Sequence, residues 1–189
     1  SKQHIAEVIS HELSHQWFGN LVTMKWWDEL WLNEGFANFI EYYLVDKLYP
    51  DWKMLEQYLI TEKTYAIRLD SLPSSRPIVN KVKTPYQAVD AFDAIAYEKS
   101  GSVIRMIFNI LGEDNFMSGL HDYFKKYSYK SASSSDLINC WQKYTKLNLK
   151  DFTKTWLYEP GIPKIEVSVL SNSNKSNKIK LVQSRFLSE

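Results

Sequence analysis

The sequence predicts a mainly α-helical chain that ends in a short stretch of β-structure. Apolar residues recur at helical spacing over most of the chain up to about residue 158. Glycine and proline, which interrupt helices, are scarce, with 6 of each among 189 residues. From residue 164 the pattern changes to the apolar and polar alternation that is typical of a strand.

The helices can be placed by their periodicity and by their stop signals. They are expected at about residues 2–19, 33–48, 51–68, 92–111, 113–127, 134–147 and 150–158. In the first helix, Ile5, Ile9 and Leu13 lie near helical spacing, and Gly19 marks its end. Residues 22–31 form an aromatic connector. Residues 71–90, which contain three prolines, are expected to be mostly loop.

The C-terminal segment carries the strand pattern. Ile165, Val167 and Val169 alternate with polar residues, 171–177 is a polar loop, and a second alternating segment begins at Ile179. An isolated hairpin is marginally stable in water, so we expect it to belong to a second, β-rich domain. Both ends of the sequence suggest a fragment of a longer protein.

Composition excludes several classes of protein. The formal net charge of +1 argues against nucleic acid as the main partner. Hydrophobic residues make up 44% of the chain, which argues against disorder, yet no stretch reaches the ~18 apolar residues of a membrane helix, so no membrane contact is expected within this segment. A single cysteine, Cys140, excludes an internal disulfide framework and is expected to be a buried thiol.

The strongest chemical signal is His11-Glu12-Leu13-Ser14-His15 in the first expected helix. Residues i and i+4 share a helix face, so His11 and His15 direct two imidazoles to one point, which suits two zinc ligands. Glu12 leans toward the same face and can reach a metal-bound water. The alternative is an amphipathic helix with two exposed histidines. The other two histidines, His4 and His121, are expected at the surface.

A third protein ligand must then be a carboxylate, and Glu34 is the candidate. It lies near the start of the next expected helix, with eighteen residues between it and His15. Antiparallel packing of the first two helices would bring Glu34 to the histidine pair. Glu41 follows on the same face, where it could accept the second N–H of a ligand histidine. A surface carboxylate is an equally weighted alternative for Glu41.

These residues resemble a known family. His11 to Met24, Trp26-Trp27 and Leu30 to Ala37 closely resemble the zinc aminopeptidases of the aminopeptidase N type, a group that includes the glutamyl and puromycin-sensitive enzymes. Weaker similarity continues through 70–78 and 92–99 to Gly161-Ile162-Pro163. The resemblance implies a helical lobe of a thermolysin-like zinc peptidase domain at residues 1–160, followed at 161–189 by the first strands of a β-sandwich domain.

The resemblance also implies roles for individual residues. His11, His15 and Glu34 would bind one Zn²⁺ per chain. Glu12 would be the general base for attack of a zinc-activated water on the N-terminal peptide bond of a peptide. Tyr97 stands where the family has the tyrosine that stabilises the tetrahedral intermediate, although spacing alone favours a core tyrosine. Glu34 is also expected to contact the α-ammonium group of the substrate.

The sequence departs from the family at several points. Ser100 follows Lys99 where relatives have glycine, and Arg76 stands where they often have histidine, so we expect adjustments of packing or of the pocket. The family's Gly-x-Met-Glu-Asn segment, which binds the amino group of the substrate and precedes the zinc helix, does not occur in this sequence.

Four interpretations follow. The first is a segment of a zinc aminopeptidase that acts on peptides together with the remainder of its parent protein. The second is a zinc-binding but catalytically incomplete fragment or isoform that lacks the amine-binding segment. A related zinc endopeptidase or epoxide hydrolase is disfavoured by the tryptophan-rich context, and a metal-free helical bundle remains as the last alternative. Localisation stays open between a membrane-anchored ectodomain and the cytoplasm for the parent protein.

Overall fold

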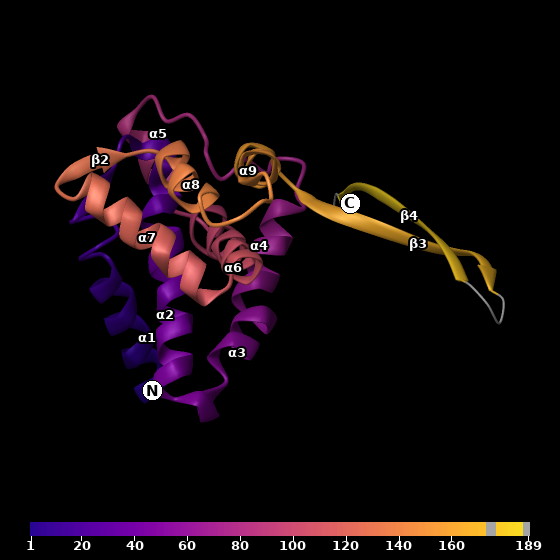
Figure 1. Ribbon diagram of the computed structural model, residues 1–189, viewed down its shortest axis with the longest axis horizontal. Helices are drawn as coiled ribbons and strands as arrows, with labels where there is room; N and C mark the ends of the chain where they lie inside the picture. Colours follow the sequence, from indigo (N-terminus) through magenta and orange to yellow (C-terminus); the bar gives the residue numbers. More distant parts are fainter. Residues whose placement is uncertain (173–176, 187–189) are drawn as a thin grey trace.

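A helical body with a projecting β-hairpin makes up the fold (Figure 1). The computed structural model describes residues 1–172 and 177–186. The helices are α1 (Lys2–Ser14), α2 (Glu34–Leu48), α3 (Met54–Ile60), α4 (Glu62–Asp70), α5 (Pro85–Asp90), α6 (Ser100–Leu111), α7 (Glu113–Tyr127), α8 (Ser134–Gln142) and α9 (Leu149–Tyr158). Short tighter or wider helical turns are η1 (Trp27–Leu32), η2 (Pro50–Trp52) and η3 (Ile95–Lys99). The prediction of a mainly α-helical chain is confirmed.

Several expected helices are divided or shortened. The helix expected at 51–68 is divided into η2, α3 and α4, with Lys53 in the left-handed region at φ 51°. The helix expected at 92–111 begins with η3, a π-helical turn, before α6. The region 71–90 contains α5, which starts at Pro85 after Thr84 accepts a hydrogen bond from the Gln87 backbone.

The first helix ends earlier than predicted, at Ser14 rather than near Gly19. The following residues continue as turns, because the backbone N–H groups of Trp17 and Phe18 still donate to Ser14. Gly19 then reverses the chain with φ 131°, a backbone conformation that favours glycine. This turn leads into β1 (Val22–Met24), which pairs in parallel with β2 (Lys130–Ala132).

The C-terminal strands β3 (Ile162–Asn172) and β4 (Asn177–Phe186) form an antiparallel hairpin that extends away from the helices (Figure 1). Val167 pairs with Leu181 in its register. The predicted loop 171–177 is shorter than expected, since both of its ends belong to strands and residues 173–176 lie outside the described residues. The division into a peptidase lobe and a β-sandwich domain stays a prediction.

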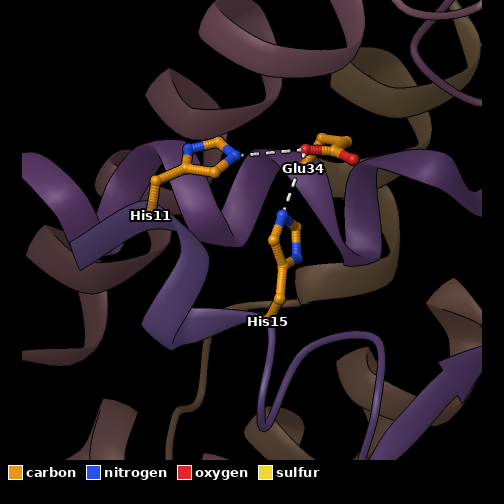
Figure 2. A group of neighbouring side chains, drawn as sticks. All are labelled: His11, His15 and Glu34. Atoms are coloured by element: carbon orange, nitrogen blue, oxygen red, sulfur yellow. Dashed lines mark ion pairs between the residues drawn. The ribbon is translucent and has the colours of Figure 1, made fainter. Parts of the chain in front are cut away.

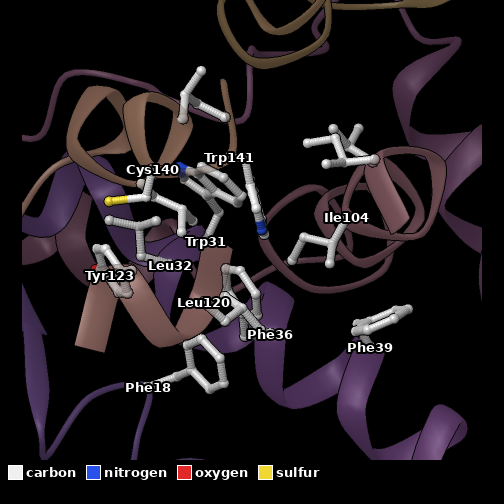
Figure 3. Close-up of a cluster of buried hydrophobic side chains, with 14 of the residues drawn as sticks. Phe18, Trp31, Leu32, Phe36, Phe39, Ile104, Leu120, Tyr123, Cys140 and Trp141 are labelled. Atoms are coloured by element: carbon white, nitrogen blue, oxygen red, sulfur yellow. The ribbon is translucent and has the colours of Figure 1, made fainter. Parts of the chain in front are cut away.

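The core lies between α2, α6, α7 and α8, where aromatic side chains stack on one another (Figure 3). Phe36 of α2 is fully buried, and its ring lies 6.0 Å from that of Trp141 and 4.1 Å from that of Phe18. Cys140 is buried in this cluster, as predicted. Because Phe18 and Phe36 flank the predicted ligands in sequence, this core also fixes the ends of α1 and α2.

The apolar stripe of α1 does not face this core, contrary to what its periodicity suggests. Ile5, Ile9 and Leu13 are about half exposed or more in the described chain. The face that packs on α2 instead carries Ser10 and Ser14, whose small side chains let the two helices approach closely. Among the described residues no helix is both long and apolar enough to cross a membrane.

Candidate metal centre

Helices α1 and α2 lie side by side and run in opposite directions (Figure 1). His11 and His15 lie one turn apart at the C-terminal end of α1, and Glu34 is the first residue of α2. At the other end of the pair, Ala6 packs against Tyr42 and its neighbours. The antiparallel arrangement predicted from the sequence therefore brings the three candidate ligands together (Figure 2).

The distances between the candidate ligand atoms suit a small tetrahedral ion. One carboxylate oxygen of Glu34 lies 3.4 Å from Nε2 of His11 and 3.5 Å from Nε2 of His15. Zinc–ligand bonds of about 2.0–2.1 Å place neighbouring ligands of a tetrahedron roughly 3.3 Å apart. All three donor atoms lie within 4.8 Å of one another. The set therefore fits zinc with a fourth position left for another ligand.

The remaining ring nitrogens are occupied in a way that leaves both Nε2 atoms available. Nδ1 of His11 lies 2.7 Å from a carboxylate oxygen of Glu41, and Nδ1 of His15 lies 3.1 Å from the carbonyl oxygen of Phe18. Both partners can only accept, so each Nδ1 carries the proton. The Nε2 lone pairs then face the acceptor-only carboxylate of Glu34, an arrangement that requires a proton or a cation between them.

The charges of the metal-free site follow from this arrangement. Although burial opposes it, hydrogen bonds to Glu34 and Glu41 raise the pKa of His11 to about 9. The hydrogen bond to Glu34 also raises the pKa of His15, against the effect of burial. Conversely, the two histidines lower the pKa of Glu34 to about 2 despite its burial. The carboxylate is therefore ionised, as a metal ligand must be.

Glu41 lies inside the structure and contacts His11, which resolves its two alternatives. Its side chain is 13% exposed. Burial, together with the charges of Glu7 and Glu62, raises its pKa even though His11 acts in the opposite direction. A hydrogen bond from a ligand histidine to such a carboxylate fixes the tautomer and the ring orientation.

The two predicted catalytic residues lie on opposite sides of the histidine pair in the chain. Glu12 is exposed on α1, next to His11. Tyr97 comes from η3, and its ring lies parallel to that of His11 with centroids 6.2 Å apart. Burial raises the pKa of Tyr97, and the charge and hydrogen bond of Glu34 raise it further. The hydroxyl is therefore neutral near pH 7 and can donate.

The π-helical turn of η3 carries Tyr97 close to α2. Its wide turn is closed by a 2.9 Å hydrogen bond from the Lys99 backbone to Ala94. The hydroxyl of Ser100 donates to the carbonyls of Ala96 and Tyr97. This contact gives the departure from the family pattern at residue 100 a structural role.

Gly35 allows the close approach of α2 to η3. A Cβ atom at this position would lie 2.9 Å from Cβ of Ser100 and still closer to its hydroxyl. The residue after Glu34 therefore has to be very small for Glu34 and Tyr97 to meet.

Other predictions have mixed outcomes. His4 and His121 are exposed, as expected. The prediction that the tryptophans form core and site walls is right for Trp31, which is fully buried. It is wrong for Trp17 and Trp26, which are 46% and 56% exposed because they lie on the turns around β1.

The sequence interpretation did not assign two ion pairs close to Tyr97. Arg76 pairs with Asp93 at 2.7 Å, and Lys99 pairs with Asp70 at 2.8 Å, with both members of the second pair buried. The only prior signal was that all four residues fall in the segments of weaker family similarity.

Comparison with known proteins agrees with the site. Residues 1–156 match the peptidase family M1 domain. The chain is 40% identical over 185 residues to leucyl aminopeptidase of Saccharolobus solfataricus, covering 98% of this chain and 23% of that protein. It is 44% identical over 186 residues to alanine/arginine aminopeptidase of Saccharomyces cerevisiae, with 98% and 21% covered. It is 41% identical over 187 residues to glutamyl aminopeptidase of Bos taurus, with 99% and 19% covered.

The fold, the histidine and glutamate cluster and these matches define the chain as part of a peptidase. It belongs to peptidase family M1. The chain spans about a fifth of the length of the curated relatives that it matches.

Proposed function

We propose that this chain is the zinc-binding helical segment of an aminopeptidase, which removes single residues from the N-termini of peptides. The observation that carries the proposal is the convergence of Nε2 of His11, Nε2 of His15 and a carboxylate oxygen of Glu34 on one point. The aminopeptidase names of the relatives support the reaction.

The residues around this point have distinct roles in the proposal. His11, His15 and Glu34 hold the ion, and Glu41 orients His11. When bound, zinc supplies Lewis acidity, which makes water more acidic and a carbonyl carbon more electrophilic. Glu12 accepts a proton from the attacking water and returns it to the leaving amine.

Tyr97 and Glu34 contact the substrate in the same proposal. The neutral hydroxyl of Tyr97 donates a hydrogen bond to the oxyanion that develops from the scissile carbonyl. The anionic Glu34 attracts the α-ammonium group that distinguishes the first residue of a peptide. Both side chains border the same point, since Glu34 acts on the hydroxyl of Tyr97 through charge and a hydrogen bond.

A second candidate is a zinc-binding chain without activity of its own. It is favoured by the absence of a Gly-x-Met-Glu-Asn segment from the sequence. The two candidates share the metal site and differ in turnover, so metal content alone does not separate them.

Metal analysis tests the shared part. The purified protein should hold one zinc per chain, which His15→Ala should remove and the surface substitution His121→Ala should leave in place. A protein that holds no zinc would overturn both candidates.

An aminoacyl-fluorophore assay tests the reaction. Activity is expected when this chain is part of a longer protein that includes an amine-binding segment. Glu12→Gln should abolish it with zinc retained, whereas the exposed Glu56→Gln should not. Activity that survives Glu12→Gln would exclude Glu12 as the base, and activity of the isolated chain would exclude the second candidate.

A further inference from the structure

Arg76 uses its whole guanidinium group to hold the chain that leads into η3. Nε and Nη2 donate to the two carboxylate oxygens of Asp93, at 3.2 and 2.7 Å. Nη2 also donates to the carbonyl of Ala91, and Nη1 donates to the carbonyls of Pro77 and Ile78. These five hydrogen bonds match the five N–H donors of an arginine. The side chain is 19% exposed, so the fork is largely shielded from water.

Asp93 in turn holds the first turn of η3. Its Oδ1 atom accepts hydrogen bonds from the backbone N–H groups of Ile95 and Ala96, at 2.9 and 3.1 Å. Its backbone carbonyl accepts a 3.1 Å hydrogen bond from the N–H of Tyr97 itself. One residue therefore bonds to three successive backbone groups of the turn that carries the tyrosine.

We propose that Arg76, acting through Asp93, is a positioning residue that sets the direction of the Tyr97 hydroxyl. The inference rests on the proposed role of Tyr97 as a donor to the developing oxyanion. Two N–H bonds to one carboxylate oxygen of Asp93 define the orientation of the first turn, and the bidentate contact from Arg76 fixes that carboxylate. A donor works in such a site only when it is aimed before the charge develops.

The far end of η3 is held by a different contact. Lys99, its last residue, pairs at 2.8 Å with Asp70, which also accepts hydrogen bonds from Ser75 and from the Gly161 backbone. Both charges are buried, so removing either would leave an unpaired buried charge and disturb folding. The Arg76 pair lies closer to solvent and is the better target for substitution.

The experiment separates positioning from general damage. In the zinc-loaded full-length protein, Arg76→Gln should lower kcat by a factor of about 10–100, within the ~10²–10³ that loss of an oxyanion donor costs, and should change KM little. Arg76→Lys, which keeps the charge without the fork, should recover part of kcat. The same substitution at an exposed arginine, Arg68→Gln, is the matched control.

A double-mutant cycle shows whether the effect passes through Tyr97. In a Tyr97→Phe background, Arg76→Gln should lower kcat by less than twofold further, because the hydroxyl that it positions is already absent. A full, additive loss in that background would overturn the proposal.

A readout without turnover keeps the inference distinct from the proposed function. With 3-fluorotyrosine at position 97, the ¹⁹F signal should be single and narrow, and it should split or broaden in Arg76→Gln but not in Arg68→Gln. A ¹⁹F signal unchanged by Arg76→Gln would overturn the positioning role, whatever the kinetics. Unchanged kcat in Tyr97→Phe would instead refute the role of Tyr97.

Discussion

The rings of Phe18 and Phe36 stack with centroids 4.1 Å apart and planes at 7°, and they join the two segments that carry the candidate ligands. Phe18 lies three residues after His15 and also offers its carbonyl to that ring, at 3.1 Å. Phe36 lies two residues after Glu34. The stack therefore ties the geometry of the site to the main hydrophobic core.

Replacing Phe36 tests this connection. Phe36 is fully buried, so Phe36→Ala should lower the free energy of unfolding by about 3–5 kcal/mol, through lost burial and the cavity left behind. It should also weaken zinc binding, because Glu34 loses its support. Urea denaturation and zinc titration measure the two effects. Tyr86→Ala, at an 85% exposed position, serves as the control and should change neither by much.

The hydrogen bond from His11 to Glu41 should contribute to zinc affinity. Glu41→Gln keeps the size of the side chain but removes its charge, and partners of ligand histidines typically contribute 10–100-fold in affinity. We therefore expect zinc to bind about 10–100-fold more weakly, as measured by competition with a chromophoric chelator. Glu56→Gln should bind as the unsubstituted protein does. Equal affinity in both variants would assign Glu41 a purely structural role.

The stability of the metal-free protein should fall as the pH rises above 6.5. The pKa of His11 is raised from 6.5 to about 9 in the folded state, so the folded protein binds more protons than the unfolded chain between these values. The stabilisation is complete below pH 6.5 and is lost by about pH 9. Discounted for the solvent exposure of the pair, it amounts to about 1–2 kcal/mol.

Urea denaturation of the chelated protein at pH 6 and pH 9.5 measures this change. His11→Gln should remove most of the difference between the two conditions. A pH dependence that is the same in His11→Gln would attribute it to another group.

Close packing of Gly35 on Ser100 gives a compensating pair. Gly35→Ala would place its methyl group 2.9 Å from Cβ of Ser100, so it should destabilise the fold by about 1–3 kcal/mol, a typical cost of overpacking. Ser100→Gly removes the atoms in the way and should restore part of that loss in the double variant. Thermal unfolding of the four proteins forms a cycle, and additive effects would show that the two residues do not interact.

The site could be predicted from the sequence because its information is local. The i and i+4 spacing of His11 and His15 fixes their common face, and Glu34 was the carboxylate that the next helix offered. The helix at 113–127 has the predicted bounds, because Gly112 precedes it and the chain turns after Tyr127. In these cases short-range signals and tertiary packing agree.

Other features depend on contacts between distant residues and leave little local trace. The pairing of β1 with β2 joins segments about a hundred residues apart, each three residues long. No glycine or proline marks the break between α3 and α4 at Thr61. The ion pair of Arg76 with Asp93 crosses two turns of irregular chain, so periodicity carried no signal for it.

The wide turn of η3 shows how much depends on a single residue. A regular helix through residues 95–111 would need one residue fewer in this turn, and each residue of an α-helix rotates the next by about 100°. Deleting one residue here would thus preserve a continuous helix and its apolar face while swinging position 97 away from Glu34. In related sequences, an alignment gap within this turn would therefore mark a chain that has kept its fold and lost its phenol.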